Sequence, residues 1–424
     1  MSKRRSIFLS AISGNILEYY DFTVYATFAT EIGRTFFSAE DEIIQTLSTL
    51  VVFAIGFITR PVGGIIFGSI GDRFGRRVAL IISMLSMTLA TFTIGFIPSY
   101  EVIGFYAPII LVIMRLIQGL CISGEGAGAA IFLLEHTQNF RPGFTAALVH
   151  SAGITGSLVA SFIGIILYHF FPVLDFQWRF AFILGGIIGI IGFYFRLRVS
   201  ETPIFKILAE KKKTLKAPFI HVVKTAWQSM LITAALGGAA SSIVYLVKSY
   251  FKVYYCEVLH FSDTTALYLV SYSLVILIIT MPISGYLADR IGRLKMITYA
   301  SIAIILLSLP VLYLMDCTNM LQQILAVTIL SMLAGFISGT AYVFIISLFT
   351  PEQRFSGVAF SYNFGIALFG GTSALISRWL VLKTNLYYSP AFYIIIVTSL
   401  FLLITYCKRS LIRELLEKNI KRKS

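Results

Sequence analysis

The sequence predicts an all-α membrane protein, with twelve transmembrane helices arranged as two six-helix bundles related by pseudo-symmetry. Three observations support this fold class. The 424-residue chain is 57% hydrophobic and only 13% charged, so it has too few polar side chains to cover a soluble globule of its length. Polar segments divide it into twelve apolar runs, each close to the ~20 residues that cross a hydrocarbon core of about 30 Å. One motif also occurs twice, about half a chain apart, as expected for a duplicated bundle.

The twelve apolar runs alternate with polar connections along the whole chain. Their centres are near Tyr20, Gly56, Ser86, Gln118, Leu158, Gly186, Ala239, Leu277, Ile304, Gly335, Ala367 and Val397. The one long polar segment, which is rich in lysine, lies between the sixth and seventh runs. We therefore expect an N-terminal six-helix bundle over residues 1–197, a cytoplasmic linker over 198–224, a C-terminal six-helix bundle over 225–407 and a basic cytoplasmic tail over 408–424.

Lysine and arginine collect in alternate connections between the runs. Most of the basic residues lie on one side of the membrane, in the N-terminus, the central polar segment, the tail and the connections on the same side as these. The positive-inside rule therefore predicts a multi-pass protein of a cell membrane, expected to be a bacterial inner membrane, with both termini in the cytoplasm. The tail is expected to form a short amphipathic helix on the anionic inner leaflet. A plain topology anchor is the alternative.

The net charge of +14 does not indicate nucleic-acid binding. The basic residues form short clusters between apolar runs, and not one face with interleaved aromatic residues, so the lipid bilayer is the expected partner. The four cysteines lack CxxC or metal-ligand spacing, and no nucleophile–base constellation or nucleotide-binding loop is present. We expect neither an enzyme nor a metal or other cofactor.

The repeated motif lies between two apolar runs in each half of the chain. Its copies are GSIGDRFGRR, from Gly68 to Arg77, and GYLADRIGR, from Gly285 to Arg293. A carboxylate at such a turn can accept N–H groups of a helix N-terminus or pair with arginine, and glycine permits a tight turn. We expect a polar clasp in each half that forms in one conformation and breaks in another. Its candidate gating residues are Gly68, Asp72, Gly75, Arg76, Arg77, Asp289, Arg290, Gly292 and Arg293.

Three acids, Glu18, Asp21 and Glu125, lie inside predicted spans. A charge near the centre of a membrane helix costs at least ~2.5 kcal/mol on insertion scales, so such groups normally face the bundle interior. Glu18 and Asp21 are three residues apart on one helical face, and Arg115 is expected at similar depth. We expect these three to meet and to carry protons, because pairing and desolvation shift a carboxyl pKa in opposite directions. A static buried ion pair is the alternative.

The remaining polar residues within spans suggest a gate and a substrate site. Arg60 begins the glycine-rich run RPVGGIIFGSIG, and Glu125 is expected to pair with Arg60 or with the Arg73–Arg77 cluster in a structural or gating role. Lys248 is either an anchor for a substrate carboxylate or a side chain that snorkels to the headgroups. The expected substrate-binding residues, between the two halves, are Tyr25, Gln118, Tyr245, Lys248, Tyr362 and Asn363.

At these residues the sequence resembles the major facilitator superfamily. GDRFGRR and ADRIGR are similar to its signature loops after helices two and eight, and RLIQG is similar to its helix-four signature. The resemblance narrows to the metabolite:proton symporter family of proline/betaine and α-ketoglutarate permeases, through GNILEYYDFTVY, RPVGGIIFGSIGDRFGRR, RLIQGLCISGEGAG, WRFAFILGGIIGIIGFYFRLRVSETPIF and RFSGVAFSYNFGIALFGG. It covers nearly the whole chain. It implies uptake driven by proton entry, and alternating access by two rocking halves.

Some positions depart from that family's pattern. Tyr19 and Tyr20 replace a common tryptophan–aromatic pair, and Lys248 stands where a neutral residue is expected. The tail is too short for the heptad extension of osmosensing members, and helix five lacks the Gly-Pro pair of drug antiporters. We therefore expect a monomeric secondary transporter that imports a small polar solute, such as an amino acid, betaine or carboxylate, together with protons. A proton-driven exporter and a transporter-like sensor that moves nothing are the alternatives.

Overall fold

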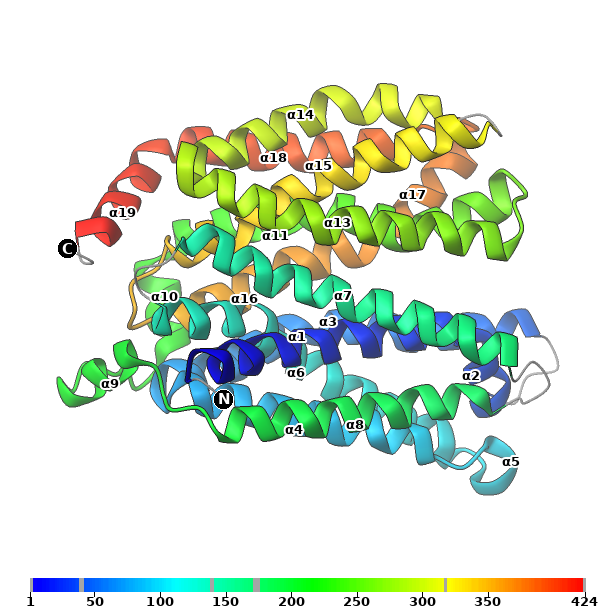
Figure 1. The fold of residues 1–424 in the computed structure, drawn as a ribbon, viewed down its shortest axis with the longest axis horizontal. Coiled ribbons are helices and arrows are strands. Elements are labelled where there is room, and N and C mark those ends of the chain that lie inside the picture. Colours follow the sequence, from blue (N-terminus) through cyan, green and yellow to red (C-terminus); the bar gives the residue numbers. More distant parts are fainter. Residues whose placement is uncertain (1–2, 38–41, 138–140, 171–175, 316–318, 422–424) are drawn as a thin grey trace.

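The computed structural model describes residues 3–37, 42–137, 141–170, 176–315 and 319–421, and every regular element in these ranges is a helix. The helices run along the long axis of the molecule in two groups (Figure 1). We call the group α1–α8 the N-half and the group α11–α18 the C-half. The end of the molecule where α1 begins and α18 ends is called the terminal end, and the opposite end is called the far end.

The N-half contains six long helices and two short ones. Its elements are α1 (Lys3–Thr27), α2 (Ala29–Phe36), α3 (Glu42–Arg73), α4 (Arg76–Phe96), α5 (Tyr100–Ile103), α6 (Tyr106–His136), α7 (Pro142–Phe170) and α8 (Gln177–Leu197). The first six predicted span centres fall inside α1, α3, α4, α6, α7 and α8. The short α2 and α5 lie in the far-end connections, where the sequence did not indicate helices.

The C-half repeats this arrangement, with π-helical turns in two of its long helices. Its elements are α11 (Trp227–Tyr245), η1 (Leu246–Tyr250), α12 (Phe251–Val253), η2 (Tyr254–Val258), α13 (Asp263–Ile291), α14 (Arg293–Leu314), α15 (Met320–Ile346), α16 (Arg354–Gly365), η3 (Ile366–Gly370), α17 (Gly371–Thr384) and α18 (Pro390–Cys407). The chain from α11 through η2 forms one span, and the chain from α16 through α17 forms another. The remaining six predicted centres fall inside these helices.

Eleven helices of the described residues are long and apolar enough to cross a membrane. The one predicted span that is not among these eleven is the first, α1, because Asn15, Glu18 and Asp21 interrupt its apolar sequence. All three side chains are buried, and α1 packs against α6, α7 and α8. The most polar of the long N-half helices therefore lies inside the bundle, where Asp21 meets Arg115 of α6.

Three further helices lie at the terminal end (Figure 1). α9 (Pro203–Glu210) and α10 (Pro218–Thr225) belong to the long polar segment between the halves, and α19 (Arg409–Lys421) is the tail helix that its amphipathic sequence predicts. The hydroxyl of Thr202 accepts a hydrogen bond from the backbone N–H of Phe205 at 3.2 Å. With proline at the first helical position, this N-cap explains why α9 begins there.

The two halves are in close contact at the terminal end. Helix α7 packs along α13, and α16 packs along α3. A Cβ added at Gly68 would lie 2.7 Å from the Cα of Ser356, so glycine permits α3 to approach α16. The backbones of Gly143 and Gly285 make the equivalent close approach between α7 and α13. The halves are therefore sealed against each other at this end.

At the far end a cavity of about 560 Å³ separates the halves. Its lining comes from α1, α2 and α7 of the N-half and from α12 and α13 of the C-half. The lining residues are Thr27, Thr30, Ile165, Tyr168, His169, Lys252, Thr264, Leu267 and Tyr268. The structure is thus closed at the terminal end and hollowed between the halves at the far end.

Candidate substrate and proton site

Asp21 and Arg115 form an ion pair between α1 and α6 inside the N-half. Their side chains are 0% and 1% exposed, and the Nη1–Oδ2 distance is 3.5 Å. That is longer than the ~2.7–2.9 Å of a strong charged hydrogen bond. The guanidinium also lies 3.5 Å from the centre of the Tyr25 ring, a cation–π arrangement. Arg115 is therefore held by groups other than Asp21, so the pair can separate without releasing the arginine.

Gln118 completes this arrangement. Its side-chain oxygen accepts a hydrogen bond from Arg115 Nη1 at 2.8 Å, and its Nε2 donates to the hydroxyl of Thr91 at 3.0 Å. The hydroxyl of Tyr25 donates to the backbone carbonyl of Thr49 at 3.2 Å. Tyr25 and Gln118 thus belong to the surroundings of the ion pair, within the N-half, and not to the surface between the halves that the sequence suggested for them.

Glu18 does not join this pair. The charged side chains that act on it are those of Arg60, Glu125 and Lys248. Residues three apart on a helix of 3.6 residues per turn differ by about 60° in direction, so Glu18 and Asp21 reach different neighbours. Glu18 is 6% exposed, and its Oε2 has no hydrogen-bond partner among the described residues. The expectation that Glu18, Asp21 and Arg115 meet is therefore correct only for the last two.

Arg60 of α3 faces the C-half. Its guanidinium carbon lies 4.4 Å from the centre of the Phe57 ring and 4.8 Å from that of Phe22. Its Nη1 is 3.5 Å from the hydroxyl of Tyr245, across the boundary between the halves. Arg60 is 4% exposed, and within the described chain its Nε has no hydrogen-bond partner. This cation is therefore held mainly by aromatic rings.

Lys248 lies on the π-helical turn η1 and points to the N-half. Its Nζ is 4.8 Å from the centre of the Tyr19 ring, and its charge interacts with those of Arg60 and Glu18. The alternative that Lys248 snorkels to the headgroups is therefore wrong. A π-helical turn inserts one extra residue and turns the following side chains, which sequence periodicity does not reveal.

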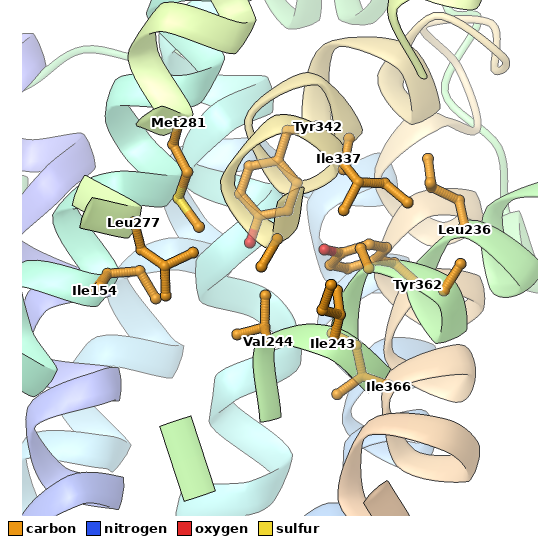
Figure 2. Packing of buried hydrophobic residues seen from close by; sticks show 14 of the residues in the cluster. Ile154, Leu236, Ile243, Val244, Leu277, Met281, Ile337, Tyr342, Tyr362 and Ile366 are labelled. Atoms are coloured by element: carbon orange, nitrogen blue, oxygen red, sulfur yellow. The ribbon is translucent and has the colours of Figure 1, made fainter. Parts of the chain in front are cut away.

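Two tyrosines from the C-half and a histidine from the N-half extend this group. The rings of Tyr342 and Tyr362 lie 5.5 Å apart at an angle of 69°, and Figure 2 shows them side by side within the apolar core. The His150 ring of α7 stacks on Tyr342 at 4.4 Å. The sequence singled out neither Tyr342 nor His150 as a site residue, because neither has a charged neighbour in sequence. Only the approach of α7 to α15 brings them together.

These residues form what we call the central cluster, between the two halves. Its members are Glu18, Tyr19, Arg60, His150, Tyr245, Lys248, Tyr342 and Tyr362. Asn363 is buried next to Tyr362, but its Nδ2 donates to the carbonyl of Ala359 in its own helix at 2.8 Å. The structure thus brings together Tyr245, Lys248 and Tyr362 of the expected substrate residues, and leaves Tyr25 and Gln118 elsewhere.

Glu125 pairs with Arg196, near the terminal end of α8. The distances are 2.5 Å from Nη2 to Oε2 and 2.9 Å from Nη1 to Oε1, and the hydroxyl of Ser83 donates to Oε1 at 2.5 Å. The expectation that Glu125 pairs with Arg60 or with Arg73–Arg77 was wrong. Arg196 reaches inward from a helix end that a hydropathy argument assigns to the interface. This two-point pair joins α4, α6 and α8 within the N-half.

Arg196→Met is expected to destabilise the protein by about 3–5 kcal/mol, because it leaves the Glu125 carboxylate buried without its partner. Thermal unfolding of the purified protein in detergent measures this loss. The double variant Glu125→Gln, Arg196→Met is expected to regain part of the stability, since no uncompensated charge remains. A single variant as stable as the double variant would contradict the proposed pairing energy.

The two motif aspartates cap helices of the opposite half. Asp72 at the end of α3 accepts hydrogen bonds from the backbone N–H groups of Phe355 (3.2 Å) and Ser356 (2.8 Å), in the first turn of α16. Asp289 of α13 accepts from those of Gly143 (2.7 Å) and Phe144 (3.0 Å), in the first turn of α7. We call these contacts the cross-caps. The sequence suggested such a cap within each half, whereas the structure places each one between halves.

The turns after the two aspartates need glycine. Gly75 has φ +123° and ψ +148°, and Gly292 has φ +99° and ψ +137°, a region that is nearly restricted to glycine. Arg290 lies over the Tyr286 ring at 4.6 Å, and Arg293 interacts electrostatically with Asp289. The second copy of the motif thus keeps its basic residues next to the capping aspartate.

Glu135, which the sequence did not single out, supports the first cross-cap. Its carboxylate lies 3.3 Å from Nε of Arg76 and 3.2 Å from Nη1 of Arg354, and it accepts the Thr202 hydroxyl at 2.7 Å. Arg76 also pairs with Asp72 at 3.2 Å. Since Arg354 begins α16, Glu135 joins the two halves and the polar segment between them.

Glu201, an acid of the polar segment itself, holds the start of α4. It accepts the backbone N–H of Arg77 at 2.9 Å and that of Thr202 at 2.7 Å. Burial raises the pKa of Glu201, against the effect of these hydrogen bonds and of the Arg76 charge. The Arg77 side chain donates to the carbonyl of Leu197 at 2.9 Å. The polar segment is therefore anchored to the first motif copy.

Two six-helix bundles, closed against each other at one end and meeting around buried charges, define a multi-pass membrane transporter. The matching family model is that of the Major Facilitator Superfamily, over residues 11–374. The chain belongs to this superfamily, as its motifs predicted.

Its relatives confirm the narrower resemblance to proline/betaine permeases. The chain is 30% identical over 411 residues to the glycine betaine/proline/ectoine/pipecolic acid transporter OusA of Dickeya dadantii, covering 94% of this chain and 82% of the relative. It is 29% identical over 408 residues to the proline/betaine transporter of Escherichia coli K12, covering 93% and 81%.

Among solved structures, the proton:xylose symporter XylE bound to 6-bromo-6-deoxy-D-glucose matches with a TM-score of 0.76 and 17% identity, over 97% of this chain and 96% of the other. A partially occluded inward open structure of XylE from E. coli matches with a TM-score of 0.67 and 18% identity, over 96% and 99%. These structures are similar in fold.

Proposed function

We propose that this transporter imports a small polar organic solute, such as an amino acid, a betaine or a carboxylate, together with protons. The observation that carries this proposal is the buried Asp21–Arg115 pair, with its long contact of 3.5 Å, next to a second buried acid at the boundary of the halves. The relatives' names, which specify betaines and proline, support the solute class. The name of XylE, a proton symporter, supports coupling by analogy of fold.

The proton step follows from the surroundings of Asp21. When Asp21 is ionised, it pairs with Arg115; when it takes up a proton, the attraction is lost. Arg115 then remains in place, because the Tyr25 ring and Gln118 still hold it. Protonation therefore changes the contact between α1 and α6 without unfolding either helix. Glu18, three residues earlier on α1, is the second proton-coupling group in this proposal.

The solute binds at the central cluster. This cluster draws residues from α1, α3 and α7 of the N-half and from α11, η1, α15 and α16 of the C-half, so a bound solute contacts both halves. Arg60 and Lys248 supply positive charge, and the tyrosines supply hydroxyl donors and apolar ring faces. A solute that bridges the halves favours conformations in which they close around it, which couples binding to movement.

The cross-caps form the gate at the terminal end. Each capping aspartate satisfies two N–H groups of a helix in the other half, so the two contacts must break when the halves separate at this end. Of the clasp residues, Arg76 pairs with Asp72 and Arg293 interacts with Asp289. Arg77 and Arg290 belong to the same two motif copies. Opening the terminal end and closing the far-end cavity would complete an alternating-access cycle.

The membrane arrangement follows from the distribution of basic residues. We infer that the terminal end faces the cytoplasm of a bacterial inner membrane, with both termini inside and the tail helix α19 on the inner leaflet. Residues 198–224 would then form the cytoplasmic linker between bundles 1–197 and 225–407, and 408–424 the cytoplasmic tail. A single chain holds both halves of the site, which supports a functional monomer.

Uptake into proteoliposomes tests the proposed function. Purified protein is reconstituted, a pH gradient (outside acidic) is imposed, and accumulation of labelled amino acids, betaines and carboxylates is measured. Accumulation that collapses with a protonophore is the expected result. Accumulation that requires the inside to be acidic would indicate export, and binding without any flux would indicate a sensor.

A further inference from the structure

The central cluster contains more positively charged than negatively charged side chains. Arg60 and Lys248 are two cations, and Glu18 is the one acid whose charge is shared with both. The other two acids inside the predicted spans have their own arginines, since Asp21 pairs with Arg115 and Glu125 with Arg196. With Glu18 ionised and Lys248 protonated, the cluster therefore carries a net charge of about +1.

This net positive charge is the same whether the proton is on Lys248 or on Glu18. If the proton moves from Lys248 to Glu18, both become neutral and Arg60 still carries one positive charge. His150 also faces the cluster, through its contact with Tyr342, and it adds either no charge or a further positive one. The tyrosine hydroxyls are uncharged when protonated. The cluster therefore has a net positive charge as long as either Lys248 or Glu18 holds this proton.

An unbalanced charge away from water is unfavourable until an opposite charge arrives. Arg60 is 4% exposed, and its Nε finds no hydrogen-bond partner in the described part of the chain. Rings of Phe22 and Phe57 cover its guanidinium, which replaces only part of the lost hydration. Lys248 is half-buried on the opposite half. Arg60 contacts Tyr245 of the C-half, and Lys248 contacts Tyr19 of the N-half. Two donors on opposite sides of the boundary suit a carboxylate between them.

We propose that the central cluster selects a monovalent organic anion, with a carboxylate between Arg60 and Lys248, over a zwitterion of the same shape. This inference rests on the proposed function, because it specifies the solute of the same site. A zwitterion brings no net charge and places its ammonium near a positive cluster. Its ammonium would compete with Lys248, whose Nζ already lies over the Tyr19 ring at 4.8 Å.

Isosteric solutes separate the charge of the ligand from its shape. Glycine betaine, a zwitterion, and 3,3-dimethylbutanoate, an anion, differ only in the nitrogen or carbon atom that carries the three methyl groups. Proline and cyclopentanecarboxylate are a second such pair and share a five-membered ring. Dissociation constants are measured by calorimetry and by thermal shift, which rises with RT ln(1 + [L]/Kd). We expect each anion to bind about tenfold or more tightly than its zwitterion, given the strength of charge interactions in a partly buried site.

Lys248→Gln tests the origin of this preference. It removes one cation, so the ratio of anion to zwitterion affinity is expected to fall by about tenfold. Lys252→Gln is the matched control, since it removes the same charge four residues along, at the far-end cavity. It is expected to leave the ratio unchanged.

The outcomes separate this inference from the proposed function. Tighter binding of the zwitterions to the unaltered protein would overturn the inference alone, and so would a ratio that Lys248→Gln does not change. If no amino acid, betaine or carboxylate binds or is taken up, the proposed function fails and the inference fails with it.

Discussion

Asp21→Asn is expected to remove the proton coupling that Asp21 supplies, and so to lower the accumulation of the solute, while leaving binding and exchange intact. Asparagine has nearly the same shape and still accepts a hydrogen bond from Arg115, but it takes up no proton. Each pH unit across the membrane is worth about 1.4 kcal/mol per coupled proton, a tenfold concentration ratio. With two pH units imposed, each coupled proton supports a ratio of about 100, so the ratio that the variant reaches is expected to be about a hundredfold lower than that of the unaltered protein.

The measurement compares two fluxes in the same proteoliposomes. Accumulation under a pH gradient reports coupling, and exchange of labelled for unlabelled solute without a gradient reports movement of the loaded carrier. Glu257→Gln is a control, because Glu257 is an exposed acid that pairs with Arg378 in the C-half, outside the central cluster. Asp21→Asn protein that accumulates solute to the same ratio as the unaltered protein would show that Asp21 carries no proton.

The double variant Asp72→Asn, Asp289→Asn is expected to shift the protein toward conformations open at the terminal end. Each substitution removes the charge from two hydrogen bonds to helix N-terminal N–H groups, which we estimate at about 1–2 kcal/mol per cap. The two together are worth roughly 3 kcal/mol, or about a hundredfold change in the ratio of closed to open protein. Each single variant is expected to produce about half of this free-energy change.

Spin labels on the two halves measure that shift. Val78 of α4 and Tyr299 of α14 are exposed near the terminal end on opposite halves, and their label-to-label distance should lengthen in the double variant. The distance between a matched pair of labels at the far end should shorten, because the halves approach each other at that end when they separate at the terminal end. An unchanged distribution at both ends would mean that the cross-caps do not hold the gate.

The same contacts explain which partners sequence reasoning missed. Asp72 and Asp289 were identified as helix-capping groups from their place in a repeated turn, but the helices they cap are far away in sequence. Nothing in GDRFGRR points to Phe355 or Ser356. The halves must pack face to face before an acid at the end of α3 meets the first turn of α16.

The partner of Arg196 could not be predicted from the sequence either. A charged residue at the end of an apolar run is assigned to the interface, where no partner is required. Its side chain is long enough to turn back into the bundle and reach Glu125. The separation of Glu18 from Arg115 has a similar origin, since the direction in which α1 faces depends on its packing against α6, α7 and α8.

Hydropathy, the duplicated motif and the acids within the predicted spans were sufficient to predict the twelve long helical segments, their duplication and the Asp21–Arg115 pair. These properties depend on residue type and on spacing along one helix, and both can be read from the chain. The central cluster, the cross-caps and the Glu125–Arg196 pair depend on how helices rotate and approach one another. Many side chains decide that approach together, so only the folded structure shows which buried charge meets which.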